Sequence, residues 1–173
     1  MPIEKTTTLY YYNELSDEAK ATARMWYAEG ADFQNVYECL FDDAERVGLK
    51  IKYIGNRGGK NKAYFITSAP ECAENILANH GKDCETYKTA KAYLESLPDY
   101  PVIDESEADC DVVLYDKYDV AKQQADDEFL YSLLEDYRII GEKECEYQLS
   151  DAVISENIWI NEYTFTVNGK RAD

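Results

Sequence analysis

The stretch "YDVAKQQADDEFLYSLLEDYRIIGEKECEYQL", residues 118–149, carries apolar side chains at helical spacing over most of its length. One set recurs every four residues and three further apolar positions widen it: Ala121, Ala125, Phe129, Leu133 and Tyr137, with Leu130, Leu134 and Ile140. A helix with this period buries one face against a core. The stretch therefore predicts one long helix, which Gly141 either breaks or bends.

Capping and turn signals divide the rest of the chain. Ser16 and Gly30 bound a predicted first helix, and a second follows Asp32 as far as Val47. The remaining predicted elements are strands at 7–12, 49–54, 63–67 and within 161–171, helices at 70–79, 83–97 and 151–158, and a loop at 98–111. They predict an α+β fold, a single domain over residues 1–173 with about five helices. Both chain ends can join the small antiparallel sheet of the 49–67 hairpin.

The net charge of −17 is concentrated in one part of the chain. Residues 99–156 hold 18 acids and 4 bases, whereas residues 1–98 hold 15 acids and 12 bases. We therefore expect an acidic face, mainly within 99–156. Such a face repels nucleic acids and anionic membranes and attracts basic proteins. The predicted partner is a basic host protein, for example a nucleic-acid-binding defence enzyme, with no direct binding to nucleic acid or membrane.

The acids of the long helix are regularly spaced. Glu128, Glu135, Glu142 and Glu146 share one flank, and at ~1.5 Å per residue they span about 27 Å. That length corresponds to about eight base pairs at ~3.4 Å each. The candidate partner-binding residues are Asp104, Glu105, Glu107, Asp109, Asp111, Tyr115, Tyr118, Glu128, Glu135, Asp136, Glu142 and Glu146, with the two tyrosines as aromatic anchors. The alternative is an acidic face that only keeps the protein in solution.

Catalytic and metal-binding patterns are weak. The single histidine, His80, precedes Gly81 at a predicted helix end, where it favours the helix dipole. Counted from Asp104, an EF-hand loop would need Gly at position 109 and Glu at position 115, and neither is present. The spacing of Cys72, His80 and Cys84 lacks a fourth zinc ligand. We therefore predict no enzyme activity, no cofactor and no metal site.

The glycine-rich stretch "GNRGGKNK", residues 55–62, lacks the order of a phosphate-binding loop and predicts a hairpin turn. An anion site there, or docking on the protein's own acidic face, stays open. No apolar run reaches the ~20 residues of a membrane span, and no signal peptide opens the chain. Five widely spaced cysteines do not form a disulfide pattern, so a bacterial cytoplasm is the expected location.

Four blocks of the sequence resemble a family of small acidic phage and prophage proteins: "NELSDEAKATAR" (13–24), "VYECLFDDAERVGLKIKYI" (36–54), "LLEDYRIIGEKECEYQLSD" (133–151) and "NEYTFTVNGKR" (161–171). The family pattern is E-L-S-x-x-A-K-x-x-A near the start and N-E-Y-x-F-x-x-x-G-K-R near the end. The family has no established function, and some members carry an antitoxin label. The resemblance implies a phage origin and action in a host bacterium.

Together, these observations favour a non-catalytic phage inhibitor of a host defence or nucleic-acid-handling protein. Its acidic surface would imitate nucleic acid. The alternative is an antitoxin-like protein that neutralises a basic toxin. A third, less favoured hypothesis is a metal-dependent nuclease built on Asp109, Asp111 and acids of the long helix. The sequence leaves open whether the chain forms a homodimer.

Overall fold

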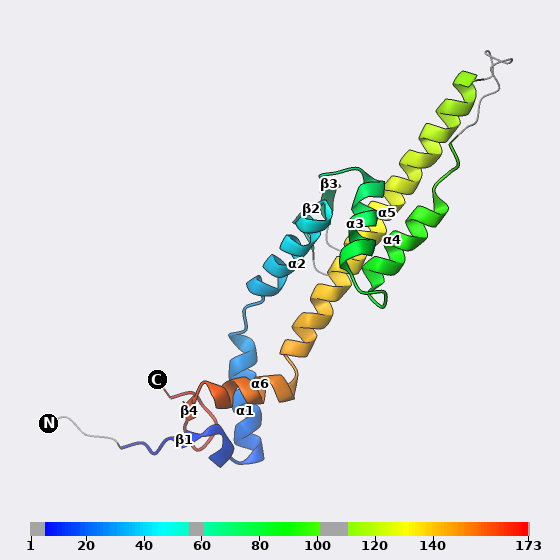
Figure 1. The fold of residues 1–173 in the computed structure, drawn as a ribbon. Coiled ribbons are helices and arrows are strands. Elements are labelled where there is room, and N and C mark those ends of the chain that lie inside the picture. The colour runs from blue at the N-terminus through cyan, green and yellow to red at the C-terminus, as the bar shows by residue number, and fades with distance from the viewer. Residues whose placement is uncertain (1–5, 56–60, 101–110, 173) are drawn as a thin grey trace. The chain divides into compact units, whose positions relative to one another are not determined.

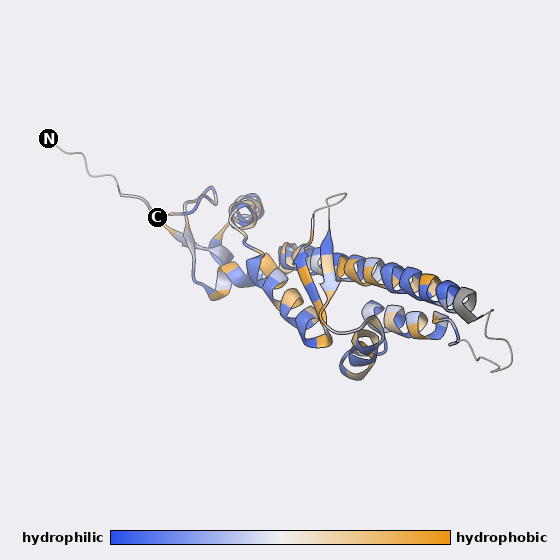
Figure 2. Cartoon of the chain, turned by 90° about the horizontal axis from the view of Figure 1, so that it is seen from above, coloured by the Kyte–Doolittle hydropathy of each residue, from blue (hydrophilic) through white to orange (hydrophobic). Residues whose placement is uncertain are grey.

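The computed structural model describes residues 6–55, 61–100 and 111–172, and the side chains of the long helix from Tyr115 onward. It confirms the predicted α+β single domain with one long acidic helix (Figure 1). Within the described residues there are six α-helices and two small antiparallel sheets. These elements cluster into unit 1, Met1–Val36 with Glu142–Asp173, and unit 2, Tyr37–Gly141. In both units hydrophilic and hydrophobic residues alternate along the helices (Figure 2).

Unit 1 is built from the two ends of the chain. Its elements are β1 (Tyr10–Tyr11), the 3-10 helix η1 (Tyr12–Glu14), α1 (Asp17–Glu29), α6 (Asp151–Ile160) and β4 (Thr164–Phe165). Strand β1 pairs antiparallel with β4, with Tyr10 opposite Phe165. The Ser16 side chain accepts a hydrogen bond from the backbone N–H of Ala19 and so begins α1 as the sequence predicts.

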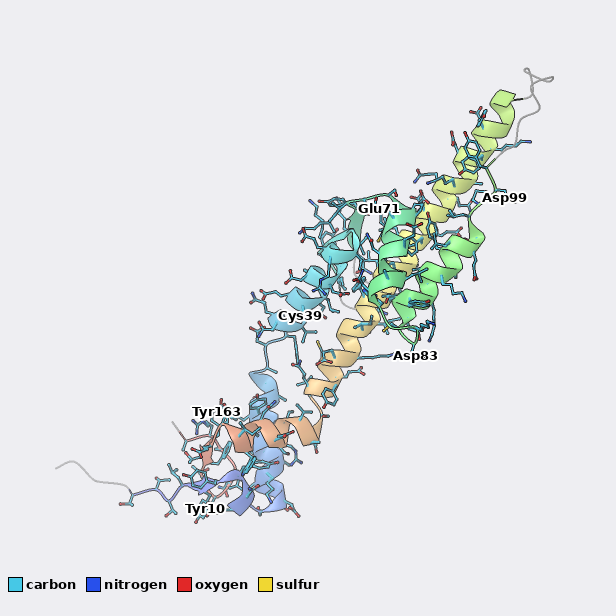
Figure 3. All side chains as sticks on the ribbon, in the orientation of Figure 1. Tyr10, Cys39, Glu71, Asp83, Asp99 and Tyr163 are labelled. Atoms are coloured by element: carbon cyan, nitrogen blue, oxygen red, sulfur yellow. The ribbon has the colours of Figure 1, made fainter. Side chains whose placement is uncertain are left out.

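The core of unit 1 lies between α1, α6 and β4. Ala19 and Ala23 give α1 a small-residue face, against which Ile154 and Ile158 of α6 and Phe165 pack. Tyr10 and Tyr163, which Figure 3 labels, are only partly buried and cover the edge of this core. Burying a side chain as large as Ile158 or Phe165 contributes about 1.5–3 kcal/mol, so this small unit depends on a few residues.

The C-terminal turn packs closely against the backbone of α1 at a glycine, Gly169. Gly169 has a φ of +76°, a left-handed conformation, and a Cβ built at this position would lie 2.0 Å from the carbonyl oxygen of Ala19. Only glycine fits such a close backbone approach without strain. The pair Asn168-Gly169, a residue combination typical of turns, therefore makes a packing contact as well as a turn.

Unit 2 surrounds the larger core. Its elements are α2 (Gln34–Val47), which begins in unit 1, β2 (Leu49–Tyr53), β3 (Lys62–Phe65), α3 (Ala69–Asn79), α4 (Glu85–Ser96) and α5 (Asp111–Gln148), whose last turns belong to unit 1. Helices α3 and α4 pack against each other, and β2 pairs antiparallel with β3. Strand β3 adds the partly buried Ala63 and Phe65 to this core. The buried side chains come from the other five elements: Ala44, Val47, Leu49, Ile51, Ala69, Cys72, Ala73, Ile76, Ala90, Tyr93, Phe129, Leu133, Leu134 and Tyr137.

Two details of the predicted fold are corrected. The chain ends do not join the 49–67 hairpin, because β1 and β4 form a sheet in unit 1 and β2 and β3 another in unit 2. Helix α5 begins at Asp111, seven residues before the predicted start, and continues through Gly141. A Cβ on Gly141 would lie 3.0 Å from Cδ1 of Leu40 and 3.2 Å from Cε1 of Tyr37. The glycine thus allows α2 to approach α5 and does not interrupt the helix.

No helix among the described residues has both the length and the apolar character needed to cross a membrane.

Candidate functional site: the outer face of α5

Helix α5 is held in unit 2 by a stack of aromatic rings. Phe129 stacks on Tyr93 of α4, with ring centroids 4.2 Å apart, and on Phe65 of β3 at 5.6 Å. Tyr93 and Phe129 are buried, so the stack fixes which side of α5 faces the core. Parallel stacking of this kind adds about 0.5–1.5 kcal/mol to the burial itself. The opposite side of α5 is consequently held toward solvent.

Acids next to the core are bonded to donors. Asp126 accepts hydrogen bonds from the hydroxyl of Tyr93 and from the ammonium group of Lys122, the latter at 2.7 Å. Only 17% of the Asp126 side chain is exposed. Burial, together with the nearby Asp126 carboxylate, raises the pKa of Tyr93, which keeps its hydroxyl protonated as a donor. Asp126 therefore helps to hold α5 against α4.

The solvent side of α5 in unit 2 forms a different surface, which we call the outer face. Its residues are all exposed and comprise four acids, one base, two amides and two large apolar or aromatic side chains: Asp116, Asp119, Asp127, Glu128, Lys117, Gln123, Gln124, Val120 and Tyr131. Tyr131 is 74% exposed and Val120 is 68% exposed. Large side chains that are this exposed are available for contact with a partner.

Two carboxylates of the outer face are held by neutral groups. Nε2 of Gln123 donates to Asp127 at 2.9 Å, and Nε2 of Gln124 donates to Glu128 at the same distance. Both pairs are four residues apart, the spacing at which side chains meet on a helix. A neutral amide restrains a carboxylate without cancelling its charge. The outer face thus presents fixed negative charges beside the exposed Tyr131.

An open groove runs beside the outer face, where α4 meets α5. Its volume is about 320 Å³. Glu128 lines it together with Thr89, Ala92, Tyr93, Ser96, Ala125, Phe129 and Ser132. A carboxylate at the edge of such a groove can receive a basic side chain that reaches in from a partner.

The structure separates the predicted site residues. Asp104, Glu105, Glu107 and Asp109 lie outside the described residues. Asp111 is the first residue of α5, and its side chain is not described. Glu128 and Glu146 are exposed, but Glu146 belongs to unit 1, as does the half-buried Glu142.

The predicted aromatic anchors are half-buried. The ring of Tyr100 meets those of Tyr115 and Tyr118 with centroids 6.0 Å and 5.2 Å apart. Tyr100 itself is 65% exposed. The three tyrosines therefore form a small aromatic cluster, in which Tyr100 offers the most accessible ring.

Glu135 and Asp136 are less free than the sequence suggested. Both oxygens of Glu135 accept hydrogen bonds from the guanidinium of Arg138, which lowers the pKa of Glu135 and balances its charge. Asp136 is half-buried and accepts a 2.6 Å hydrogen bond from Thr89 of α4. Burial raises the pKa of Asp136, more than the Thr89 hydrogen bond lowers it. Asp136, a predicted partner-binding residue, is therefore partly covered by α4 and less accessible than the exposed acids of α5.

Two lysines of the β2–β3 hairpin contact residues close to them in the fold. Lys50 pairs with Glu45 at 2.5 Å, and the ammonium group of Lys52 lies 5.4 Å from the centre of the Tyr64 ring. Arg57 and Lys60 lie outside the described residues. Within the part of the chain that is described, the hairpin forms no ion pair with an acid of α5.

His80 takes part in a partly buried polar network in unit 2. Its Nδ1 lies 2.8 Å from the hydroxyl of Thr86, and its Nε2 lies 3.3 Å from Oδ2 of Asp43, beyond good hydrogen-bond geometry. Tyr137 donates to the same Asp43 oxygen at 2.9 Å. The order hydroxyl, imidazole, carboxylate resembles a catalytic triad. Thr86 is only 1% exposed, however, so its hydroxyl cannot reach a substrate, and the network joins α2, α3, α4 and α5.

Among the described residues, no group of three or more His, Cys, Asp or Glu side chains is placed to hold a metal ion. The predicted loop acids around 104–109 lie outside the described residues. Cys72 is buried, and burial raises the pKa of its thiol to about 12, which makes it a poor metal ligand or nucleophile.

Comparison with known protein families, with curated proteins and with solved structures found no match to this chain.

The sequence did contain a signal for this face. Val120, Asp127 and Tyr131 all fall outside the apolar set that recurs every four residues from Ala121. The predicted flank of regularly spaced glutamates includes Glu128 but not Tyr131, Asp127 or the two glutamines that restrain the acids.

Proposed function

We propose that the chain is a phage-encoded, non-catalytic inhibitor that acts in the bacterial cytoplasm. It binds a basic host protein that handles nucleic acid, such as a defence enzyme, and occupies the groove meant for DNA or RNA. The outer face of α5 is the binding surface. The observation that carries the proposal is the pair of glutamine–carboxylate hydrogen bonds, which fix Asp127 and Glu128 without neutralising them.

Charge and rigidity support this proposal together. A groove shaped for nucleic acid carries lysines and arginines placed for a stiff row of phosphates. A helix presents its carboxylates on an equally stiff frame, so little conformational entropy is lost when they meet such a groove. Asp127 and Glu128 have already lost part of their side-chain freedom to the glutamines.

Exposed apolar surface supports a protein partner. Tyr131 and Val120 are more exposed than any other large apolar or aromatic side chain of the described part of unit 2. Tyrosine supplies a large, rigid contact area and is enriched in binding hot spots. Charge would guide the encounter, and contact with Tyr131 would slow dissociation.

The test is affinity capture from a bacterial lysate at about 50 mM and about 500 mM salt, followed by competition with duplex DNA. We expect capture of a nucleic-acid-binding protein at low salt, its loss at high salt, and its release by DNA. The double variant Asp127→Asn/Glu128→Gln should capture at least ~10-fold less, a loss of about 1.4 kcal/mol or more.

The matched control removes two charges elsewhere in the same unit. Asp42 of α2 and Glu74 of α3 are exposed, and the variant Asp42→Asn/Glu74→Gln should capture as much partner as the unchanged chain. Equal losses in the two double variants would show that net charge alone matters. Capture that ignores salt, or that DNA does not reverse, would also contradict the proposal.

A further inference from the structure

A second hollow lies in unit 1 and shares no residue with the outer face of α5. Its volume is about 580 Å³, within the range of binding sites for small molecules or peptide side chains. Six residues from η1, α6 and the segments beside them line it: Tyr11, Asn13, Glu14, Trp159, Ile160 and Glu162.

The large side chains that line this hollow are highly exposed. Trp159 and Ile160 are each 59% exposed, and Tyr11 is 55% exposed. The core of unit 1 already uses the other face of α6, through Ile154 and Ile158. Packing within the unit therefore does not explain why a tryptophan and an isoleucine end this helix. Contact with a ligand does.

Two carboxylates flank these rings. Glu14 is held in place because its Oε2 accepts a 2.8 Å hydrogen bond from the backbone N–H of Tyr11. Glu162 is held by the backbone, at a φ of +53°. Within the described residues neither glutamate has an ion pair, and no basic residue lines the hollow.

The conformation of Glu162 is costly for this residue type. It follows the end of α6, where its N–H donates to the carbonyl of Trp159 and the N–H of Tyr163 donates to that of Ile158. Glycine is the usual residue at this position, because other residues are strained by about 1 kcal/mol or more. Within the described residues the Glu162 side chain forms no hydrogen bond or ion pair that would offset this strain, so a function of the side chain is the better explanation.

Aromatic faces beside unpaired carboxylates attract an organic cation. Guanidinium fits best, because its plane stacks on Trp and Tyr rings while its N–H groups donate to carboxylates. Unit 1 already contains one guanidinium packed on aromatic rings. The guanidinium of its own Arg171 lies 4.7 Å from the Tyr163 ring centre and 5.7 Å from that of Trp26.

We propose that the hollow lined by Tyr11, Trp159, Glu14 and Glu162 binds an arginine side chain of a basic polypeptide. The guanidinium stacks on the Trp159 and Tyr11 rings and donates to the two carboxylates. Ile160 covers the methylene groups of the arginine. Because the site lies on other residues, it stands or falls separately from the proposed inhibitor surface.

The test uses nuclear magnetic resonance of the full chain, labelled with 15N. The chain has two tryptophans, so the indole N–H signals of Trp26 and Trp159 are distinguished by the variant Trp159→Phe. A capped Gly-Arg-Gly-Arg-Gly peptide should move the Trp159 signal in a saturable way and leave the Trp26 signal in place. The same peptide with citrulline, which keeps the shape but not the charge, should bind at least ~10-fold more weakly.

Variants connect the signal to the two carboxylates. Glu14→Gln/Glu162→Gln should weaken peptide binding at least ~10-fold. The matched control Glu29→Gln/Glu156→Gln removes two exposed charges of the same unit and should leave binding unchanged. Glu162→Gly relieves the strained φ, so it should unfold at the same or a higher denaturant concentration and still bind more weakly. A Trp159 signal that does not move, equal binding of the citrulline peptide, or full binding by Glu14→Gln/Glu162→Gln overturns the proposal.

Discussion

The side-chain amide of Gln124 donates a 2.9 Å hydrogen bond to Oε1 of Glu128, one turn further along α5. Two residues away on the same helix, Lys122 meets Asp126 at the same spacing, at 2.7 Å. The pair with a cation lies against the core, and the pair with a neutral amide faces solvent. At these two pairs of α5, the partly buried carboxylate is balanced by a cation and the exposed carboxylate keeps its charge.

Gln124→Lys should reduce partner binding with little change in stability. A lysine four residues before Glu128 can restrain the same carboxylate, and such a pair changes helix stability by only about 0.2–0.5 kcal/mol. It also cancels the charge, so we expect several-fold weaker capture of the partner at low salt and a smaller effect of added salt. Chemical denaturation and salt-dependent capture measure the two effects.

The control for this variant is Ala78→Lys, which adds the same charge at an exposed position of α3 in the same unit. If it weakens capture as much as Gln124→Lys, the effect comes from the charge of the whole protein and not from the outer face.

Tyr137→Phe should destabilise the protein. The Tyr137 hydroxyl is buried and donates to Asp43 across 94 positions of the chain, linking α5 to α2. Removing a hydrogen bond to a charged acceptor costs about 1–3 kcal/mol, and among the described residues Asp43 would keep only the poorly aligned His80. Tyr131→Phe makes the same change on an exposed ring and should alter the unfolding free energy by less than about 0.5 kcal/mol. Equal effects in urea denaturation would contradict the assigned role.

The sequence predicted the helices well where capping signals were present. Ser16 begins α1 and Gly30 follows its end, as expected, because both signals act within a few residues. Asp32, predicted to cap the second helix, does accept the N–H of Gln34. The start of α5 was predicted too late, because the acids and apolar residues from Asp111 to Lys117 do not follow the every-four pattern.

The candidate site was less predictable, because burial depends on which neighbour covers a residue. The spacing of Asp136 on the helix did not reveal that Thr89 of α4 would meet it. Likewise, Gly141 reads as a helix breaker in the sequence, whereas contact with Leu40 and Tyr37 explains it. Tyr131 and Tyr137 are the same residue type on one helix, and only their phase relative to the apolar set separates the exposed ring from the buried one.

Asp136→Asn should stabilise the protein at neutral pH. Burial is the main cause that raises the pKa of Asp136 above its ordinary value of 3.8, so its ionised form is disfavoured in the folded state. The penalty is absent below pH 3.8, where the group is protonated in both states, and it is complete once the pH exceeds the raised folded pKa. Asparagine keeps an oxygen that can accept the Thr89 hydrogen bond.

We therefore expect Asp136→Asn to raise the unfolding free energy at pH 7 by less than about 1 kcal/mol, since the side chain is still partly exposed to water. The gain should shrink as the pH falls and vanish near pH 3, followed by urea denaturation across the range. Asp127→Asn, on the exposed outer face, is the control and should show a smaller gain. A gain that grows toward low pH would contradict a raised pKa of Asp136 in the folded protein.

Gly169→Ala should be among the most damaging single-methyl changes in unit 1. The φ of +76° strains any residue other than glycine, and the added Cβ would lie 2.0 Å from the carbonyl oxygen of Ala19, where backbone must move. Strain and overpacking each cost about 1–3 kcal/mol, so we expect the unfolding free energy measured by urea denaturation to fall by about 2–5 kcal/mol.

Gly81→Ala is the matched control, because its φ is not left-handed and its Cβ would meet only Sγ of Cys84 at 3.7 Å. That variant should stay within about 0.5 kcal/mol of the unchanged chain. Equal stability of the two variants would mean that the C-terminal turn does not pack on α1 in solution.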